Sequence, residues 1–195
     1  MNKRIEEKMV EMNLGEGKYC FPYVTILYDY IIEHRPKIII ELGTGHGATT
    51  TGMAMALREN NEGHIFSHDY YSESGWGTDM NVVQEKLNSV ELGAWVTLKN
   101  VNAYDWLFSP SHTKIDMLYV DIHNDAAVIE TFMDNSFIKG QMENGMPLFF
   151  EGSPHPERET VCRARGQRPF SSLKYHHETL YDARTGLSVI WGDKK

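Results

Sequence analysis

The chain has 195 residues, a formal net charge of −8, 41% hydrophobic residues and 24% charged residues. This length favours one domain with a sizeable core, and the composition is typical of a soluble globular protein. The negative net charge argues against a surface that binds nucleic acid through general positive charge. We therefore expect no nucleic-acid partner.

Cysteine content and hydropathy bear on the compartment. Cys20 and Cys162 are the only cysteines, and they are far apart and form no CxxC pair. Neither a disulfide framework nor a zinc cluster is suggested. The N-terminus is charged, and no apolar run approaches the length that spans a bilayer. These features predict a cytoplasmic protein with no membrane partner.

Apolar and β-branched runs alternate with helical patterns along the chain. Residues 1–18 are expected to form an arm that is mobile or packs on a second subunit, so a homo-oligomer stays open. The segment 152–172 is polar and rich in Pro, His and Arg, and we expect a long loop that closes as a lid. Helices are predicted over 21–32, 48–58, 79–90 and 128–138, and strands over 38–40, 64–69, 95–98, 115–121, 146–151, 175–181 and 187–191.

The order of these elements predicts the fold class. Alternating strands and helices form an open, mostly parallel sheet with helices on both faces. The last two strands are joined by a short turn and predict an antiparallel hairpin. We therefore expect an α/β protein with a Rossmann-like, doubly wound sheet of seven strands, and a single domain over 1–195.

A glycine-rich turn follows the first predicted strand. Glu41 stands near the end of that strand, and Gly43, Gly45 and Gly47 follow it at every second position. Glycines permit a sharp turn and let a ligand approach the backbone closely. An acid two residues before the first glycine suits a cationic ligand better than a phosphate. The stretch therefore predicts strand, ligand-binding turn and helix.

The Glu-x-Gly-x-Gly-x-Gly pattern resembles motif I of the class I S-adenosylmethionine (SAM) methyltransferases. The resemblance implies that Glu41, Gly43, Thr44, Gly45 and Gly47 contact SAM, whose sulfonium and ammonium groups are positive. The fold ends with an antiparallel strand in that family, as predicted here.

Two other interpretations of the turn stay open. The spacing Gly43-x-Gly45-x-x-Ala48 also fits a dinucleotide fingerprint. A purely structural turn is the third possibility. A nicotinamide-dependent oxidoreductase is disfavoured by Glu41 and by the terminal hairpin, and a two-domain dehydrogenase would need more chain than is present.

Further cofactor contacts are predicted at the ends of the next two strands. Asp69 lies 22 residues after Gly47, where an acid accepts hydrogen bonds from both ribose hydroxyls of a nucleoside. The alternative is a residue that only starts a loop. Asn102 and Ala103 follow the third strand, in the region where class I methyltransferases touch adenine, and Asp105 is an equal candidate there.

Asp121 and Glu151 end the fourth and fifth predicted strands, so they are expected at the same sheet edge as Glu41 and Asp69. Two such carboxylates suit Mg²⁺ or another divalent cation. From residue 20 to 151 the chain resembles the metal-dependent O-methyltransferases: catechol and caffeoyl-CoA types, and most of all the sugar O-methyltransferases grouped with cephalosporin hydroxylase-like proteins. This resemblance implies a metal at Asp121 and Glu151.

The chain departs from that pattern after the fifth strand. Those families usually carry Asp or Asn after the acid, whereas Gly152 follows Glu151 here. A third ligand would come from water or from the stretch His123, Asn124 and Asp125. The alternative is that the acids cap strands and pair with loop arginines such as Arg158 or Arg163.

His123 is the candidate general base, because its ordinary pKa lies near neutral pH. Asp121 would lie beside the methyl donor or the acceptor. His155, His176 and His177 are further candidates. We expect SAM-dependent methyl transfer to a small-molecule acceptor, at a hydroxyl oxygen. A non-catalytic SAM-binding protein is the alternative, and Gly152 favours it.

Overall fold

The computed structural model describes residues 21–71, 79–110 and 113–193, so the predicted arm at 1–18 lies outside the described residues. The elements fall into two compact units, Met1–Ser109 and Pro110–Lys195. The single-domain organisation stays a prediction, and each unit is described by itself. Within the described ranges, no helix is long and apolar enough to cross a membrane.

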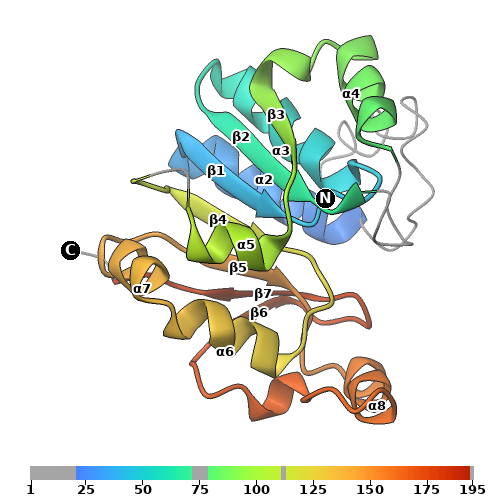
Figure 1. The fold of residues 1–195 in the computed structure, drawn as a ribbon, viewed down its shortest axis with the longest axis vertical. Coiled ribbons are helices and arrows are strands. Elements are labelled where there is room, and N and C mark those ends of the chain that lie inside the picture. Colours follow the sequence, from blue (N-terminus) through green and yellow to red (C-terminus); the bar gives the residue numbers. More distant parts are fainter. Residues whose placement is uncertain (1–20, 72–78, 111–112, 194–195) are drawn as a thin grey trace. The chain divides into compact units, whose positions relative to one another are not determined.

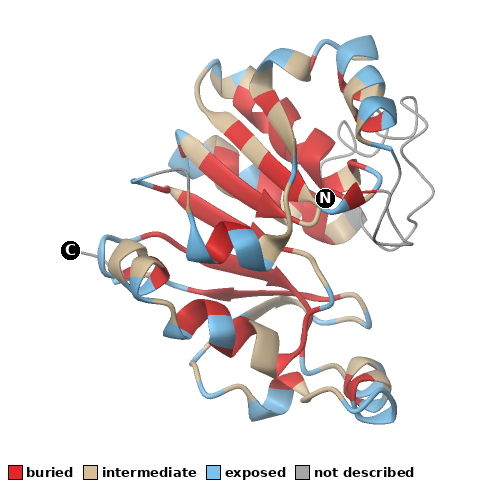
Figure 2. Ribbon diagram, viewed as in Figure 1, coloured by how far each residue is buried: buried red, intermediate tan, exposed pale blue. Residues whose placement is uncertain are grey.

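The first unit contains three parallel strands in the order β3-β2-β1. Strand β1 is coloured mostly as buried in Figure 2. Its residues Ile39, Ile40 and Leu42 have no exposed surface. Helices α2 and α3 pack closely at Gly52, where a Cβ would lie 2.2 Å from a methyl carbon of Val24. The elements are α2 Phe21–His34, β1 Ile38–Leu42, α3 Ala48–Asn60, β2 His64–Asp69, α4 Met80–Ser89, η2 Gly93–Trp95, β3 Val96–Asn100 and α5 Ala103–Phe108 (Figure 1).

The second unit contains four strands in the order β4-β5-β7-β6. Strands β4 and β5 are parallel and buried along their whole length, whereas β7 runs antiparallel to both β5 and β6. The predicted terminal hairpin is therefore confirmed. The elements are β4 Met117–Val120, α6 Ala126–Asp134, α7 Ser136–Glu143, β5 Leu148–Glu151, α8 Pro156–Ala164, η3 Phe170–Ser172, β6 Glu178–Tyr181 and β7 Leu187–Ile190.

Two predicted elements of this unit are wrong. The single helix expected over 128–138 is two helices, because the side chain of Asn135 accepts hydrogen bonds from the amides of Phe137 and Ile138 and starts α7. The loop expected over 152–172 contains helix α8, which begins with a proline at its first turn. Closure of this segment as a lid stays a prediction.

Glu130 joins helix α6 to the segment before β6. Both of its oxygens accept hydrogen bonds from the guanidinium of Arg168, at 2.7 and 3.0 Å, and the amide of Lys174 donates to it at 3.0 Å. The Arg168 hydrogen bonds lower the pKa of Glu130 to about 2. Since this pKa lies below the ordinary value of 4.5, the charged carboxylate stabilises the fold.

We expect Glu130→Gln to lower the free energy of unfolding by about 2 kcal/mol at pH 7, because charged donors lose their partner. A lowered pKa gives stability that is present above pH 4.5 and is lost as the pH falls toward 2. The difference between wild type and variant should therefore shrink over that window in urea unfolding. Exposed Glu143→Gln is the control, and an equal pH-independent loss in both variants would contradict the role of Glu130.

Candidate cofactor and active site

The turn after β1 is built from three glycines with left-handed backbone angles. Gly43, Gly45 and Gly47 have φ values of 98°, 51° and 81°. The amide of Gly43 donates to the carbonyl of His68 at 2.8 Å, and the amide of Gly47 donates to the carbonyl of Thr44 at 2.9 Å. The first bond holds the turn against β2, and the second closes the turn directly before α3 begins.

The glycines are required for different reasons. A Cβ on Gly47 would lie 2.8 Å from a methyl carbon of Val83, so packing against α4 excludes a side chain there. A Cβ on Gly45 would meet no described atom within 4 Å. Among the described residues of the first unit, the backbone of Gly45 therefore borders open space, as a ligand-binding turn requires.

Glu41 braces this turn from inside the unit. Its side chain is fully buried, and its Oε2 accepts hydrogen bonds from the hydroxyls of Thr50 at 2.6 Å and Ser67 at 2.5 Å. The hydroxyl of Thr44 lies 2.6 Å from that of Ser67. The carboxylate thus links β1, β2 and α3. Direct contact of Glu41 and Thr44 with a cofactor stays a prediction.

Asp69 is the last residue of β2 and lies against the glycine turn. Its Oδ2 accepts a hydrogen bond from the amide of Gly45 at 2.7 Å, and its Oδ1 accepts one from the amide of Tyr71 at 3.0 Å. The structure therefore brings together two of the predicted cofactor residues. A half-exposed carboxylate accepts up to four hydrogen bonds, so capacity for two ribose hydroxyls remains.

Tyr71 closes the inner side of the turn. Its hydroxyl donates to Thr44 at 3.3 Å, and the side chain is 2% exposed. Burial raises the pKa of Tyr71 to about 12, so its hydroxyl stays protonated and a donor at neutral pH.

The candidates for adenine contact lie where α5 begins, directly after β3. The side chain of Asn102 accepts a hydrogen bond from the amide of Tyr104 at 2.8 Å and caps the helix. Ala103 is the first residue of α5, and Asp105 is exposed in its first turn. The structure gives Asn102 a capping role, and adenine contact by any of them stays a prediction.

The acids of the second unit lie at the carboxyl ends of β4 and β5. Asp121 directly follows β4, and its Oδ2 accepts a hydrogen bond from the hydroxyl of Tyr119 at 3.0 Å. Glu151 ends β5, and its Oε2 lies 3.0 Å from a guanidinium nitrogen of Arg158. Burial and then the charge of Asp121 raise the pKa of Glu151, and Arg158 acts in the opposite direction.

The residues predicted to bind a metal do not fit a divalent cation. Glu151 already pairs with Arg158, and His123 is exposed. The side-chain amide of Asn124 donates to the backbone carbonyls of Val120 and Glu151, at 2.8 and 2.9 Å. Across the residues with described positions, no group of three His, Cys, Asp or Glu side chains is arranged to hold a metal ion.

Asp125, which was also predicted as a possible third metal ligand, already accepts two hydrogen bonds. Its Oδ1 accepts a hydrogen bond from the amide of Val128 and caps α6, and its Oδ2 accepts one from the amide of Arg168. The predicted alternative for Glu151 is confirmed, since Arg158 is its partner. Arg163 pairs instead with Glu159, at 3.1 Å.

The candidate bases differ in their surroundings. His123 is exposed after β4, as is His176 before β6. His155 caps α8 by accepting a long hydrogen bond of 3.4 Å from the amide of Glu157. The ring of His177 packs near Phe150 and lies within hydrogen-bond distance of a backbone carbonyl. General-base catalysis by His123 stays a prediction.

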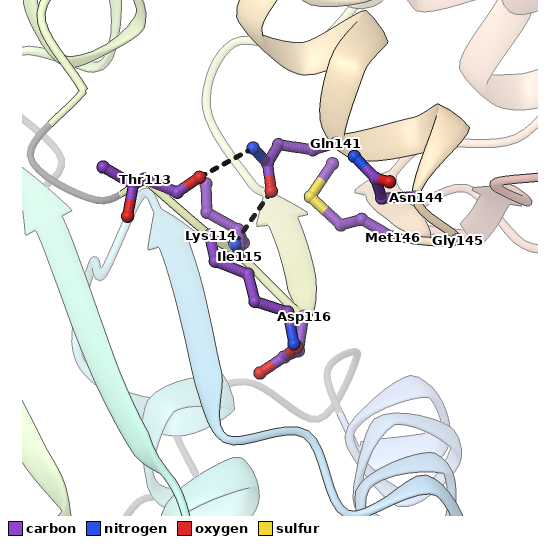
Figure 3. A pocket seen from close by; sticks show the side chains of 8 residues that line it. All are labelled: Thr113, Lys114, Ile115, Asp116, Gln141, Asn144, Gly145 and Met146. Atoms are coloured by element: carbon purple, nitrogen blue, oxygen red, sulfur yellow. Dashed lines mark hydrogen bonds and ion pairs between the residues drawn. The ribbon is translucent and has the colours of Figure 1, made fainter.

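A hollow of about 410 Å³ lies at the other ends of β4 and β5 (Figure 3). It is lined by residues 113–116, which precede β4, and by the turn between α7 and β5. Gln141 bridges its wall by accepting from the amide of Ile115 and donating to the carbonyl of Thr113. Ligands of parallel sheets bind at the carboxyl ends of strands, so this hollow is separate from the predicted site.

Sequence comparison places the chain in a family. A family model described as a methyltransferase domain matches residues 40–137, which is half of the chain. The match begins in β1 and includes the glycine turn, Asp69 and Asp121. The chain therefore belongs to the class I SAM-dependent methyltransferase family, as the resemblance of the glycine motif predicted. No curated protein sequence matches it.

Solved structures with low sequence identity share the fold. The O-methyltransferase TomG from Streptomyces achromogenes, in complex with SAM, is 14% identical over 98% of this chain and 89% of its own, with a TM-score of 0.66. The O-methyltransferase from Bacillus cereus, in complex with SAH, is 14% identical over 98% and 90%, with a TM-score of 0.64.

A third solved structure shares the fold. SAH-bound methyltransferase PaMTH1 from Podospora anserina is 14% identical over 99% of this chain and 89% of its own, with a TM-score of 0.64. Together with the seven observed strands, these similarities confirm the predicted α/β, Rossmann-like fold class.

Proposed function

We propose that this methyltransferase transfers the methyl group of SAM to a hydroxyl oxygen of a small-molecule acceptor. The observation that carries the proposal is the pairing of Asp69 with the open glycine turn, through the 2.7 Å hydrogen bond to the amide of Gly45. TomG and the Bacillus cereus enzyme are O-methyltransferases with SAM or SAH bound, and this similarity supports both the donor and the oxygen acceptor.

SAM supplies an electrophilic methyl group on a positively charged sulfur. In the proposed site, Asp69 accepts hydrogen bonds from the ribose, and the backbone of Gly45 approaches the cofactor without an intervening side chain. Glu41 keeps the turn in place from its buried position. The protein contributes chiefly by holding the donor and acceptor in line and by excluding water.

The acceptor oxygen gains a bond to carbon as the sulfur–carbon bond breaks, and the hydroxyl proton must leave. We propose that His123, an exposed histidine after β4, acts as the general base that accepts this proton. The metal assistance expected from the resemblance is not included, because the residues at Asp121 and Glu151 do not fit a divalent cation. The proposed setting is the cytoplasm, with a small-molecule partner and no nucleic acid.

The proposal is tested by methyl transfer from radiolabelled SAM to a panel of catechols, phenols, sugars and amines. We expect turnover with at least one hydroxylated acceptor and loss of most turnover in His123→Ala. Labelling of amines alone would contradict the oxygen assignment. SAM binding with no turnover on any hydroxylated acceptor would favour the non-catalytic alternative.

Asp69→Ala is expected to weaken SAM binding about tenfold or more, a loss of about 1.4 kcal/mol, because the ribose loses its acceptor. Asp69→Asn keeps an acceptor for the amide of Gly45 but loses the charge, so we expect an intermediate loss. Asp29→Ala, on the exposed side of α2, is the matched control. Equal SAM dissociation constants for all four proteins in calorimetry would contradict the assigned role.

A further inference from the structure

Arg158 occupies the carboxyl ends of β4 and β5, where the metal-dependent O-methyltransferases hold a cation. It projects from α8, and one guanidinium nitrogen lies 3.0 Å from Glu151 Oε2 and 3.0 Å from the backbone carbonyl of Asn124. The side chains of Arg158 and Glu151 are only 17% and 9% exposed. A positive charge is therefore already present beside the strand-five acid.

Aromatic packing holds this arginine in place. The guanidinium lies 5.7 Å from the ring centre of Phe170, which is within range of a cation–π interaction. Phe170 is fully buried and stacks on Phe150 of β5 at 5.7 Å. The position of the charge is thus set by the core of the unit and not by a flexible surface contact.

The same phenylalanine closes the position where a second metal ligand would stand. A Cβ on Gly152 would lie 2.2 Å from Phe170 Cζ and within 2.8 Å of two further ring atoms. Gly152 also has a φ of 132°, which side-chain-bearing residues rarely adopt. An Asp or Asn after Glu151 is therefore excluded by packing and by backbone conformation together.

We propose that Arg158 is the resident cation of this site, and that its guanidinium compensates the charge of Glu151 as a divalent ion does in the metal-dependent O-methyltransferases. Arg158 is a positioning residue that neutralises Glu151 and holds the end of β5 against the Asn124 loop. The reaction it serves rests on the proposed function, whereas its displacement of a metal rests only on these contacts.

The first test is a titration of chelator-treated wild-type protein with Mn²⁺, followed by the electron paramagnetic resonance signal of free Mn²⁺. We expect the signal to show no stoichiometric binding below about 1 mM, because Arg158 already neutralises the site. Binding of one Mn²⁺ per chain at micromolar concentration, lost in Asp121→Asn or Glu151→Gln, would overturn the proposal.

The second test removes the guanidinium and offers a metal in its place. Arg158→Met is expected to lower the melting temperature by about 5 °C or more, because it leaves Glu151 buried without its partner. Millimolar Mn²⁺ should recover part of that loss in Arg158→Met, but not in the wild type or in Arg158→Met with Glu151→Gln. No recovery by Mn²⁺ would overturn the cation role.

Arg163→Met is the matched control, because Arg163 lies on the same helix and pairs with Glu159 while its side chain is 61% exposed. We expect a shift of less than about 2 °C there, and no response to Mn²⁺. Neither test uses SAM or an acceptor. Failure of SAM binding would therefore remove the proposed function and leave the result on Arg158 intact.

Discussion

Gly45→Ala is expected to weaken SAM binding about tenfold or more while costing only about 1–2 kcal/mol of stability. The new methyl group meets no described atom within 4 Å, so we expect no clash with the described residues. The stability cost arises from the left-handed φ of 51°. The binding loss arises because the methyl group enters the space that the proposed cofactor needs. Calorimetry with SAM and urea unfolding measure the two effects separately.

Gly166→Ala is the matched control for backbone strain. Gly166 follows helix α8 and has a φ of 68°. A Cβ added there would also meet no described atom within 4 Å. Its variant should lose similar stability and keep the wild-type affinity for SAM. If Gly45→Ala binds SAM as tightly as Gly166→Ala does, the cofactor does not lie against this turn.

Gly152→Asp, which restores the acid seen in the metal-dependent families, is expected to cost about 3 kcal/mol or more of stability. The added Cβ would lie 2.2 Å from the ring of Phe170, which is buried and stacked on Phe150. The ring must move, and the backbone at a φ of 132° must also change. Urea unfolding followed by circular dichroism measures the loss.

Gly140→Asp provides the comparison, because a Cβ on Gly140 in helix α7 meets open space. Aspartate and glycine both have poor helix propensity, so we expect a change within about 0.5 kcal/mol. If Gly152→Asp were as stable as Gly140→Asp, the ring of Phe170 would move at little cost in stability. A second metal ligand at position 152 would then be tolerated.

Local sequence signals sufficed to predict the glycine turn and the elements on either side of it. The isoleucines before Glu41, the three glycines and Asp69 predicted strand, turn, helix and strand, and β2 has the predicted bounds of 64–69. Each of these features depends on residues close in sequence or on the regular length of a strand-helix-strand unit. The hydrogen bond between Asp69 and the amide of Gly45 was not predicted, and it forms where the neighbouring strands β1 and β2 end.

Features that depend on long-range packing were not predicted. Helix α8 lies in a stretch whose Pro, His and Arg content predicted a loop, and it is held by contacts such as Glu159 with Ser171. The break at Asn135 was also missed, although asparagine is a preferred residue at the N-cap of a helix. The burial of Glu41 against Thr50 and Ser67 needed the packed structure.

Gly152 shows why the predicted metal site could not be judged from the sequence alone. Gly152 was visible in the sequence as a departure from the metal-dependent pattern. The structure shows that the ring of Phe170, 18 residues later in the chain, leaves no room for a side chain at position 152. Arg158 was named beforehand as one partner of the strand-end acids, but nothing in the sequence chose it over Arg163.

The most direct test of the central claim is calorimetric titration of the purified wild-type protein with SAM and with S-adenosylhomocysteine, in the presence of a chelator. We predict one site per chain with micromolar affinity for both ligands, about −8 kcal/mol. Reduced nicotinamide cofactors under the same conditions should give no heat of binding. Binding of a nicotinamide cofactor, with none of SAM or its product, would contradict the proposed function.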